Sequence, residues 1–501
     1  MITSLVAAFA VILFLWNLKN WRKIVPPLPP GPRGLPILGY FPFLGTHLHK
    51  TFRELAGVYG PIYKLWLGNK LCVVVSSPAL AKELVRDQDT IFANRDLIAA
   101  LYAVSDGNDI AYLPYGPEWR KLRKLFVSHM MSNASLDACY SLRKQEVNKI
   151  IRDVYKRSGK AIDISELTFS ASINVIQNIL WGFTLQGERM TNLGEELREL
   201  FSELFIVLGA TNISDIFPVL SRFDIQGIAK RSKKIGIQFE SIIDAAIEQS
   251  KNMAAIRGGW NNDGKDFLQV LLELQEHEDS AKSFTMTQLK AMLMDIIVGG
   301  TDTTTTMLEW TMAELMNNPK VLKKVQEELT EVVGIDCSVE EFHLPKLQYL
   351  DAVVNETMRL HPAAPVLLPR CPSQTTIVGG YTIPKGSKIM LNVYAIQRDP
   401  QLWDNPLEFR PERFLSNSEK FDYLGNNFQY MPFGSGRRVC PGIPLAKRML
   451  MFLLASILHS FEWKLPNDTE LDLSDKWGLV AKKLKPLVVI PTPRLSNSEL
   501  Y

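Results

Sequence analysis

Cysteine is scarce in this chain, and no two cysteines have a spacing that indicates a structural pair. The 501 residues include five cysteines, at positions 72, 139, 337, 371 and 440, and no C-x-x-C pair. An odd, scattered set excludes a disulfide framework, gives no sign of a zinc site and suits a reducing compartment. The chain also lacks a large excess of positive or negative residues. Its 56 basic and 53 acidic residues leave a net charge of +3, so no nucleic-acid partner is expected.

A hydrophobic run at the start of the chain predicts a membrane anchor. Residues 2–18 are apolar apart from Thr3, Ser4 and Asn17. As a helix this run is about 26 Å long, which fits the thinner bilayer of the endoplasmic reticulum. Basic residues 19, 22 and 23 follow the run and keep the remainder of the chain in the cytosol. The alternative, a cleaved signal peptide, calls for a basic start and a small-residue cleavage site.

These patterns divide the chain into residues 1–18, a single-pass anchor; residues 19–34, a basic and proline-rich hinge; and residues 35–501, one folded domain. The domain is expected to be mainly helical with small β-sheets. The strands expected are Ile62–Leu67 and Leu71–Ser76, joined through Gly68-Asn69, and a late strand over Leu484–Ile490. Residues 142–274 are expected to be mostly helical, and Ala93–Pro114 is expected to be a loop beside a ligand cavity.

One cysteine stands in a loop rich in glycine and arginine. The pattern is Phe433-x-x-Gly436-x-Arg438-x-Cys440-x-Gly442, followed by an apolar helical run over residues 443–461. Glycines let the backbone turn tightly beside a large flat group. Helix-end N–H groups and nearby arginines favour a thiolate, which can be the axial ligand of a haem iron. A purely structural cysteine is the alternative, and five matched positions weigh against it.

A long helix is predicted from the capping box Thr285-x-x-Gln288 to about Asn317, before Pro319. Its middle, residues 299–306, contains two glycines and five threonines, which are poor helix formers. Either the helix is locally distorted there for function, or packing overrides the weak propensity.

Taken together, the chain resembles the cytochromes P450 of the plant microsomal type. The resemblance covers essentially the whole chain. It rests on the proline hinge, the Gly-Gly-x-Asp-Thr pattern at 299–303, the Glu-x-x-Arg pattern at 356–359, the segment 409–414 and the cysteine loop. The sequence segments at residues 29–40, 65–74 and 224–227 are similar to those of the plant subgroup that contains delta-cadinene hydroxylase and valencene oxidase.

The resemblance implies a haem b cofactor with Cys440 as axial ligand, and roles for further residues. Thr303 would donate a hydrogen bond to dioxygen at the iron, and Asp302 would help supply protons. The other implied residues are cofactor contacts at Phe433, Gly436, Arg438, Trp119, Arg123, Arg370, Gly299 and Gly300; a structural ion network of Glu356, Arg359 and Arg413; and substrate-pocket candidates Val298, Val366, Leu367 and Leu479.

The activity implied is that of a monooxygenase that uses O2 and electrons from NADPH, delivered by NADPH–cytochrome P450 reductase. Lys121, Lys124, Lys447 and Arg448 could form a basic docking face for that reductase, or could be ordinary surface charge. The expected substrate is a small hydrophobic terpenoid, most simply a sesquiterpene, and membrane lipid is an expected partner. The alternatives are a flavonoid hydroxylase of the same fold, a haem-thiolate isomerase or dehydratase that needs no reductase, and a haem-binding regulatory protein.

Overall fold

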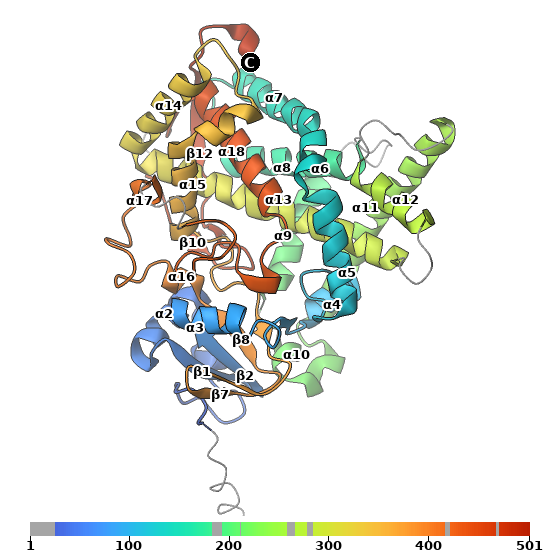
Figure 1. The fold of residues 1–501 in the computed structure, drawn as a ribbon, viewed down its shortest axis with the longest axis vertical. Helices are drawn as coiled ribbons and strands as arrows, with labels where there is room; N and C mark the ends of the chain where they lie inside the picture. Colours follow the sequence, from blue (N-terminus) through green and yellow to red (C-terminus); the bar gives the residue numbers. More distant parts are fainter. Residues whose placement is uncertain are drawn as a thin grey trace, which may run out of the picture.

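A computed structural model gives the structure of residues 26–182, 193–210, 212–257, 266–277, 284–415, 421–466 and 470–501 (Figure 1). The N-terminal run of residues 1–18 therefore lies outside the described residues. A large helical body occupies most of the molecule, and a small sheet with α2 and α3 forms its lower end in Figure 1. The helices are α2 (Leu48–Tyr59), α3 (Pro78–Lys82), α4 (Ala99–Ser105), α5 (Pro117–Leu125), α6 (Asn133–Ala138), α7 (Tyr140–Lys156), α8 (Ile164–Trp181), α9 (Leu193–Gly209), α10 (Ile213–Ile216), α11 (Ile228–Arg257), α12 (Phe267–His277), α13 (Met286–Asn317), α14 (Pro319–Val333), α15 (Gln348–Leu360), α16 (Val393–Ile396), α17 (Glu412–Leu415) and α18 (Ile443–Ser460).

Four small sheets accompany the helices. The largest has the strand order β1-β2-β8-β5-β3, in which β1 and β2 form the predicted hairpin through Gly68-Asn69 and β2 pairs parallel to β8. The others are β4-β12-β9, β6-β7 and β10-β11. The strands are β1 (Ile62–Leu67), β2 (Lys70–Val75), β3 (Asn94–Arg95), β4 (Ile162–Asp163), β5 (Arg370–Cys371), β6 (Thr376–Val378), β7 (Tyr381–Ile383), β8 (Lys388–Leu391), β9 (Phe461–Lys464), β10 (Asp475–Lys476), β11 (Lys482–Lys483) and β12 (Val488–Pro493).

Helix α13 crosses the centre of the helical body. It begins with the predicted capping box, in which Thr285 accepts from the backbone of Gln288 and Gln288 accepts from the backbone of Thr285. The helix is continuous through residues 299–306, so packing overrides the weak propensity there. Thr301, Thr303 and Thr305 each donate a hydroxyl hydrogen bond to the carbonyl four residues earlier, which satisfies these side chains inside the helix.

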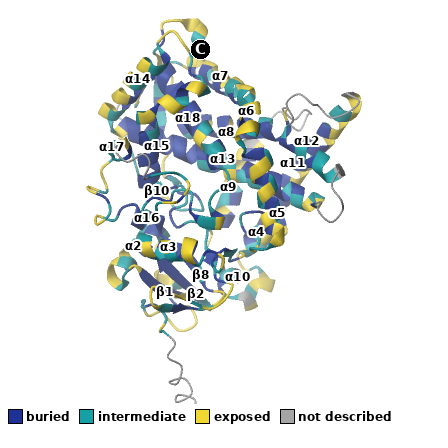
Figure 2. Ribbon diagram, viewed as in Figure 1, coloured by how far each residue is buried: buried dark blue, intermediate teal, exposed yellow. Residues whose placement is uncertain are grey.

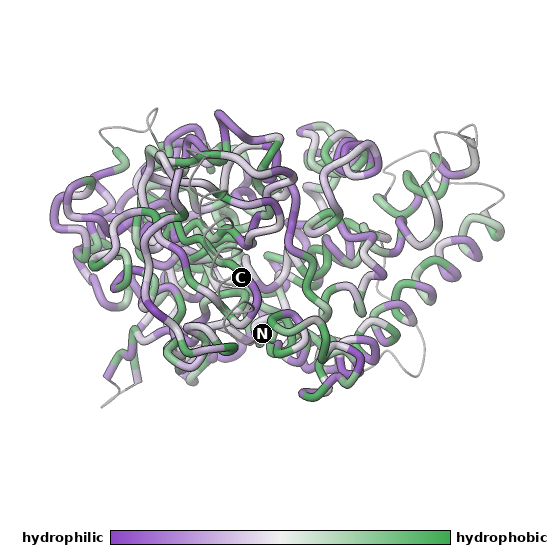
Figure 3. Tube along the Cα trace, turned by 90° about the horizontal axis from the view of Figure 1, so that it is seen from below, coloured by the Kyte–Doolittle hydropathy of each residue, from purple (hydrophilic) through white to green (hydrophobic). Residues whose placement is uncertain are grey.

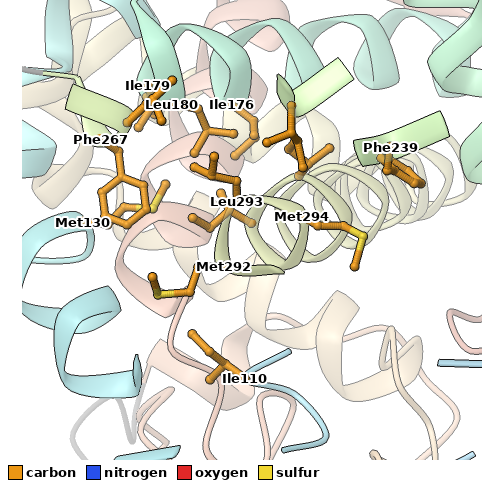
Figure 4. Packing of buried hydrophobic residues seen from close by; sticks show 14 of the residues in the cluster. Ile110, Met130, Ile176, Ile179, Leu180, Phe239, Phe267, Met292, Leu293 and Met294 are labelled. Atoms are coloured by element: carbon orange, nitrogen blue, oxygen red, sulfur yellow. The ribbon is translucent and has the colours of Figure 1, made fainter. Parts of the chain in front are cut away.

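The hydrophobic core surrounds α13 and α18, which are largely buried in Figure 2, as are α8 and α15. On one side, Leu293 of α13 faces Ile176 and Leu180 of α8, whereas Met292 points the other way, toward Ile110 (Figure 4). Residues of α11 and α12 belong to the same cluster. Among the described residues, only α18 is long and apolar enough to cross a membrane. Because 72% of it is buried inside the protein, it is a core helix here.

Three local predictions were wrong. The expected loop at residues 93–114 contains α4, whose small residues hid its period. The late strand begins at Val488 rather than at Leu484, because residues 482–483 pair with β10 and residues 484–487 turn away. The prolines at 362, 365 and 369 predict an extended segment that could line the pocket, but residues 364–367 form a turn closed by the Leu367 N–H and the Ala364 carbonyl, 3.0 Å apart.

The proline-rich segment lies against the small sheet where it is described. The backbone N–H of Lys64 in β1 donates to the Pro30 carbonyl at 2.7 Å, and Thr382 in β7 donates to Pro27 at 2.9 Å. Gly31 passes so close to β1 that a Cβ there would lie 2.1 Å from the Lys64 carbonyl oxygen. Residues 27–31 are therefore fixed to the folded body.

Candidate functional site

The loop before α18 places Cys440, which is half-buried, in a closed turn. The Cys440 N–H donates to the Phe433 carbonyl at 3.0 Å, and Gly434 and Gly436 have positive φ angles of 74° and 67° that favour glycine. A Cβ at Gly436 would lie 2.1 Å from the Val85 carbonyl oxygen, so only glycine fits there. The Phe433 ring stands edge-on to Tyr423, with ring centroids 5.9 Å apart, and holds the start of the loop against the core.

The protonation of Cys440 differs from the sequence prediction. Burial raises the pKa of this thiol, and the Gly442 backbone N–H and the Arg123 charge only partly oppose the rise. The loop's dipoles and cations alone therefore do not produce a thiolate. A metal ion bound to this thiol would deprotonate it outright.

Four buried or half-buried arginines meet around this loop. Arg123 of α5 donates to the Val439 carbonyl at 2.6 Å, and Arg370 of β5 donates to the Ser435 carbonyl at 2.7 Å. Arg438 donates to the Ala93 carbonyl at 2.6 Å, and Arg95 of β3 donates to the Leu368 carbonyl at 2.6 Å. We call Arg95, Arg123, Arg370 and Arg438 the arginine cluster. Arg95 was missed from the sequence, because a single arginine in a segment without periodicity carries no recognisable pattern.

Trp119 supports the arginine cluster. Its indole N–H donates to the Ile110 carbonyl at 3.0 Å, and its ring lies 4.4 Å from the Arg438 guanidinium and 5.4 Å from that of Arg123. The predicted Trp-x-x-x-Arg pair therefore faces the cysteine loop instead of being a surface pair. Cation–π contacts of this kind favour a fixed guanidinium orientation.

The electrostatics of the arginine cluster fit a dicarboxylate ligand. Burial lowers the pKa of Arg438 to about 9, with repulsion from Arg370 and Arg123 adding to it, and burial lowers that of Arg370 to about 10. Burial and repulsion from the other three members lower the pKa of Arg95 as well. Asp89, which is shared between Arg370 and Arg437, and Asp109, near Arg438, are the acids that act on the cluster. Cations thus outnumber carboxylates, and the two propionates of a haem would supply the missing negative charge.

In the middle of α13, one side of the helix is open and the neighbouring sides are buried. Gly299 is exposed and Thr303 half-buried, while Thr301 and Asp302 are buried, with 0% and 2% exposure. A Cβ at Gly299 would meet nothing within 4 Å, whereas one at Gly300 would lie 2.7 Å from Ile176 Cδ1. Gly299 and Thr303 therefore lie on the side that can accept a flat cofactor, and Gly300 instead allows α8 to pack closely.

Thr303 and Asp302 each have a hydrogen-bond partner within the protein, and their roles toward dioxygen stay predictions. The Thr303 hydroxyl donates to the Gly299 carbonyl at 2.6 Å, and in this rotamer its oxygen can accept from a further group. Asp302 Oδ1 pairs with Lys482 of β11 at 2.5 Å. Burial raises the pKa of Asp302, and the Lys482 charge and hydrogen bond lower it in part.

The predicted Glu–Arg–Arg network is assembled at the end of α15. Glu356 and Arg359 are both fully buried and 2.7 Å apart, and Arg413 of α17 reaches Glu356 at 3.2 Å. Arg359 also donates to the carbonyls of Gln397, Pro406 and Glu408. The network ties α15 to the segment that leads into the cysteine loop.

The four pocket candidates fall in three places. Val298 and Leu479 pack against the same cluster of hydrophobic residues from α8, α9, α11 and α13. Leu367, with a positive φ of 50°, lies beside the cysteine loop, where its Cδ1 would be 3.7 Å from a Cβ at Gly434. Val366 is 8% exposed and packs with the cluster of the small sheet, so it is separate from the others.

The predicted basic face is partly neutralised by acids of this chain. Lys447 lies 3.2 Å from Asp351, and Arg448 lies 2.5 Å from Asp137. Lys124 is exposed on α5 near the cysteine loop. Ion pairs of this kind weaken the attraction of two of the four predicted residues for an acidic partner.

Comparisons with known proteins agree on one family. The family model described as cytochrome P450 matches residues 29–490. The chain is 37% identical to a flavonoid 3'-monooxygenase of Crocosmia x crocosmiiflora over 99% of this chain and 98% of that protein. It is 38% identical to a geraniol 8-hydroxylase of Swertia mussotii over 93% of this chain and 94% of that protein. A zebra fish cytochrome P450 structure with progesterone aligns with a TM-score of 0.76 at 28% identity, over 89% of this chain and 99% of that one.

Proposed function

Since the chain belongs to the cytochrome P450 family and is a haem-thiolate monooxygenase, we propose that it hydroxylates a small terpenoid, in the simplest case a sesquiterpene. The observation that supports a hydrocarbon substrate is the set of partly buried side chains that pack on the cluster of α8, α9, α11 and α13. These side chains include Ile98, Leu101, Val104, Leu113, Phe205, Ile242, Val298 and Leu479. Apolar walls favour an apolar ligand.

A flavonoid substrate is the second candidate, because flavonoid 3'-monooxygenases of Crocosmia x crocosmiiflora and Petunia hybrida are among the relatives. The terpenoid-related names, geraniol 8-hydroxylase and ferruginol synthase, belong to relatives that are 38% identical to this chain. Identity therefore does not separate the two classes, and the apolar lining is the reason for preferring the terpenoid.

The residues that would hold the haem come from α5, α13, β3, β5 and the cysteine loop. Cys440 supplies the axial thiolate, the arginine cluster is suited to the propionates, and Gly299 leaves the α13 side open to the ring. When bound, the haem would supply the activation of O2, of which one oxygen atom enters a C–H bond and the other leaves as water after uptake of two electrons and two protons. We assign Asp302 and Thr303 of α13 to holding and moving protons, with electrons coming from NADPH through a membrane-bound reductase.

The axial assignment is tested with Cys440→Ser. A serine hydroxyl is hardly ionised at neutral pH and is a far weaker donor to iron than a thiolate. We expect the ferrous–carbon monoxide spectrum to lose its thiolate-type Soret position, while Cys371→Ser, a change at a cysteine on β5, leaves that position unchanged. A thiolate-type spectrum in Cys440→Ser would contradict the assignment.

The substrate proposal is tested with membranes that contain this chain and a plant reductase. They are incubated with NADPH and a panel of sesquiterpenes, monoterpenols and flavones, and products are identified by mass spectrometry. We expect an NADPH-dependent oxygenated product from a terpene and none from the flavones. Oxidation of flavones alone would replace the first candidate by the second.

We also propose that the lower end of the molecule rests on the endoplasmic reticulum membrane. Two exposed apolar groups lie there: Leu35, Ile37 and Phe43, which are 46%, 79% and 50% exposed, and Val219 and Phe223, which are 75% and 61% exposed. They are brought together because Ile216 and Phe217 pack on Gly68 of the β1–β2 turn, whose N–H donates to Leu38. Figure 3 views the molecule from this end. Such a surface is suited to the interface of a bilayer.

A further inference from the structure

Asp302 is buried, charged groups around it are few, and its partner comes from a distant part of the sequence. Its side chain is 2% exposed, and its second oxygen, Oδ2, is buried without a hydrogen-bond partner among the described residues. Its first oxygen contacts Lys482 Nζ at 2.5 Å. An unpaired carboxylate at this depth would be strongly disfavoured, so this one lysine decides its state.

The segment that carries Lys482 is fixed to α13 on both sides. The Trp310 indole N–H donates to the Ala481 carbonyl at 3.0 Å, and the Leu487 N–H donates to Glu309 Oε1 at 2.9 Å. The Ala481 N–H in turn donates to the Ala363 carbonyl at 2.9 Å. The position of Lys482 is thus built into the fold rather than chosen by a mobile surface side chain.

Lys482 connects the buried carboxylate to the outside. Its side chain is 39% exposed, in contrast to Asp302, and its ammonium lies 5.3 Å from the ring of Phe205 on α9. Phe205 packs on the hydrophobic cluster of α8, α9, α11 and α13. Through Lys482, the buried Asp302 is therefore linked to solvent and to α9.

We propose that Lys482 is the positioning residue for Asp302, which it holds as an oriented carboxylate so that Asp302 can accept and pass on a proton at neutral pH. This inference rests on the proposed function, since it concerns proton supply to the monooxygenase site. Burial alone would raise the pKa of Asp302, and Lys482 opposes that rise. The other charged groups near the pair are Glu309 and Lys483, which are common to all variants described below.

The test compares Lys482→Met, which removes the charge, with Lys482→Arg, which keeps it. Lys485→Met is the matched control, because Lys485 is 75% exposed and lies 3.7 Å from Asp472, away from Asp302. In each haem-loaded protein, infrared difference spectra over a pH series follow the carboxyl C=O band. The band of Asp302 is identified by its loss in an Asp302→Asn background. Product, hydrogen peroxide and NADPH consumption are measured on the same samples.

We expect Lys482→Met to move the Asp302 protonation midpoint up by about one pH unit or more. Product per NADPH should fall about threefold or more, within the range of acid–base effects. Lys482→Arg should restore both values, and Lys485→Met should change neither. An unchanged Asp302 midpoint in Lys482→Met overturns the proposal.

A failure of the terpenoid proposal can be distinguished from a failure of the Lys482 proposal. The protonation midpoint of Asp302 is measured by infrared spectroscopy and does not depend on a substrate. If no terpene is oxidised but the midpoint moves as expected, the substrate class is wrong and the role of Lys482 stands. If a terpene is oxidised with unchanged coupling in Lys482→Met, the role of Lys482 is wrong and the substrate class stands.

Discussion

The hydroxyl of Thr303 is the smallest group on which the proposed chemistry depends. It donates to the Gly299 carbonyl and is half-buried on the open side of α13. We expect Thr303→Ala to keep haem and substrate binding, since alanine is the better helix former. The variant should still consume NADPH, but product per NADPH should fall by roughly tenfold while hydrogen peroxide rises. That loss is smaller than the 10²–10⁴ of many acid–base residues because water can partly replace the hydroxyl.

Thr303→Ser is the matched variant because it keeps the hydroxyl and loses only a methyl group. It should stay within about twofold of the parent in product per NADPH. If Thr303→Ala has normal coupling with substrate bound and differs only in thermal stability or haem content, Thr303 has a packing role alone.

Glu309 of α13 gives a prediction about folding stability, which should depend on pH through the protonation of its carboxyl group. Burial raises its pKa from 4.5 to about 7, although the Leu487 N–H and the charge of Lys483 lower it in part. The folded protein thus binds a proton more tightly than the unfolded chain. The contribution of Glu309 to the free energy of unfolding is therefore fully present below pH 4.5, and it is lost as the pH rises toward 7.

Glu309→Gln removes this dependence and keeps an acceptor for the Leu487 N–H. At pH 8 we expect it to stabilise the protein by up to about 3 kcal/mol, at 1.36 kcal/mol per pKa unit, and at pH 4.5 to change stability little. Urea unfolding at the two pH values measures the difference. The control is Glu327→Gln, at a residue that is 64% exposed beside Lys323. An equal effect of Glu309→Gln at both pH values would contradict the pKa assignment.

At the scale of whole elements, the junction of α15 and α17 depends on one carboxylate. Glu356 contacts Arg359 and Arg413, and its Oε1 also accepts from the Arg410 N–H at 2.9 Å. Glu356→Gln leaves two buried guanidinium groups without a counter-charge, which should cost roughly 3–5 kcal/mol of unfolding free energy. We expect a clearly lower urea midpoint and lower haem content, while Glu327→Gln leaves both unchanged. A midpoint equal to that of the parent would show that the network is not required for stability.

Elements with strong local signals could be predicted from the sequence, and those that depend on distant contacts could not. Helix α13 was predicted within one residue because Thr285, Gln288 and Pro319 mark its ends. Helix α4 lacks such signals and is stabilised by packing against α11. In the site, Cys440 and Glu356 belong to spaced patterns, whereas Arg95 and Lys482 gain meaning only from partners far away in the chain. Contacts between residues far apart in the chain produce no hydrophobic periodicity from which they could be predicted.

For the whole molecule, the predicted anchor and the exposed apolar groups at the lower end make separable contributions to membrane binding. We expect deletion of residues 2–23 to leave a folded, haem-binding protein that binds phospholipid vesicles less tightly. Adding Ile37→Ser, Val219→Ser and Phe223→Ser should lower the remaining binding by at least a further tenfold, because tenfold corresponds to about 1.4 kcal/mol and fully burying one apolar side chain is worth about 1.5–3 kcal/mol. Co-sedimentation with vesicles measures both steps.

Ile256→Ser and Phe342→Ser are the controls, since these residues are also exposed, at 85% and 67%, but lie on α11 and near α15. They should leave vesicle binding unchanged. Loss of haem from a soluble truncated protein would contradict the division of the chain into anchor and catalytic domain.

The arginine cluster also bears on how the protein is made. Four like charges brought together in a weakly polar interior repel one another, and each must give up water to be there. A dianionic cofactor that binds only the folded chain relieves this repulsion and shifts the folding equilibrium by mass action. Haem binding would then be coupled to folding. A larger supply of haem in the cell would consequently raise the share of newly synthesised chains that mature, before any substrate is encountered.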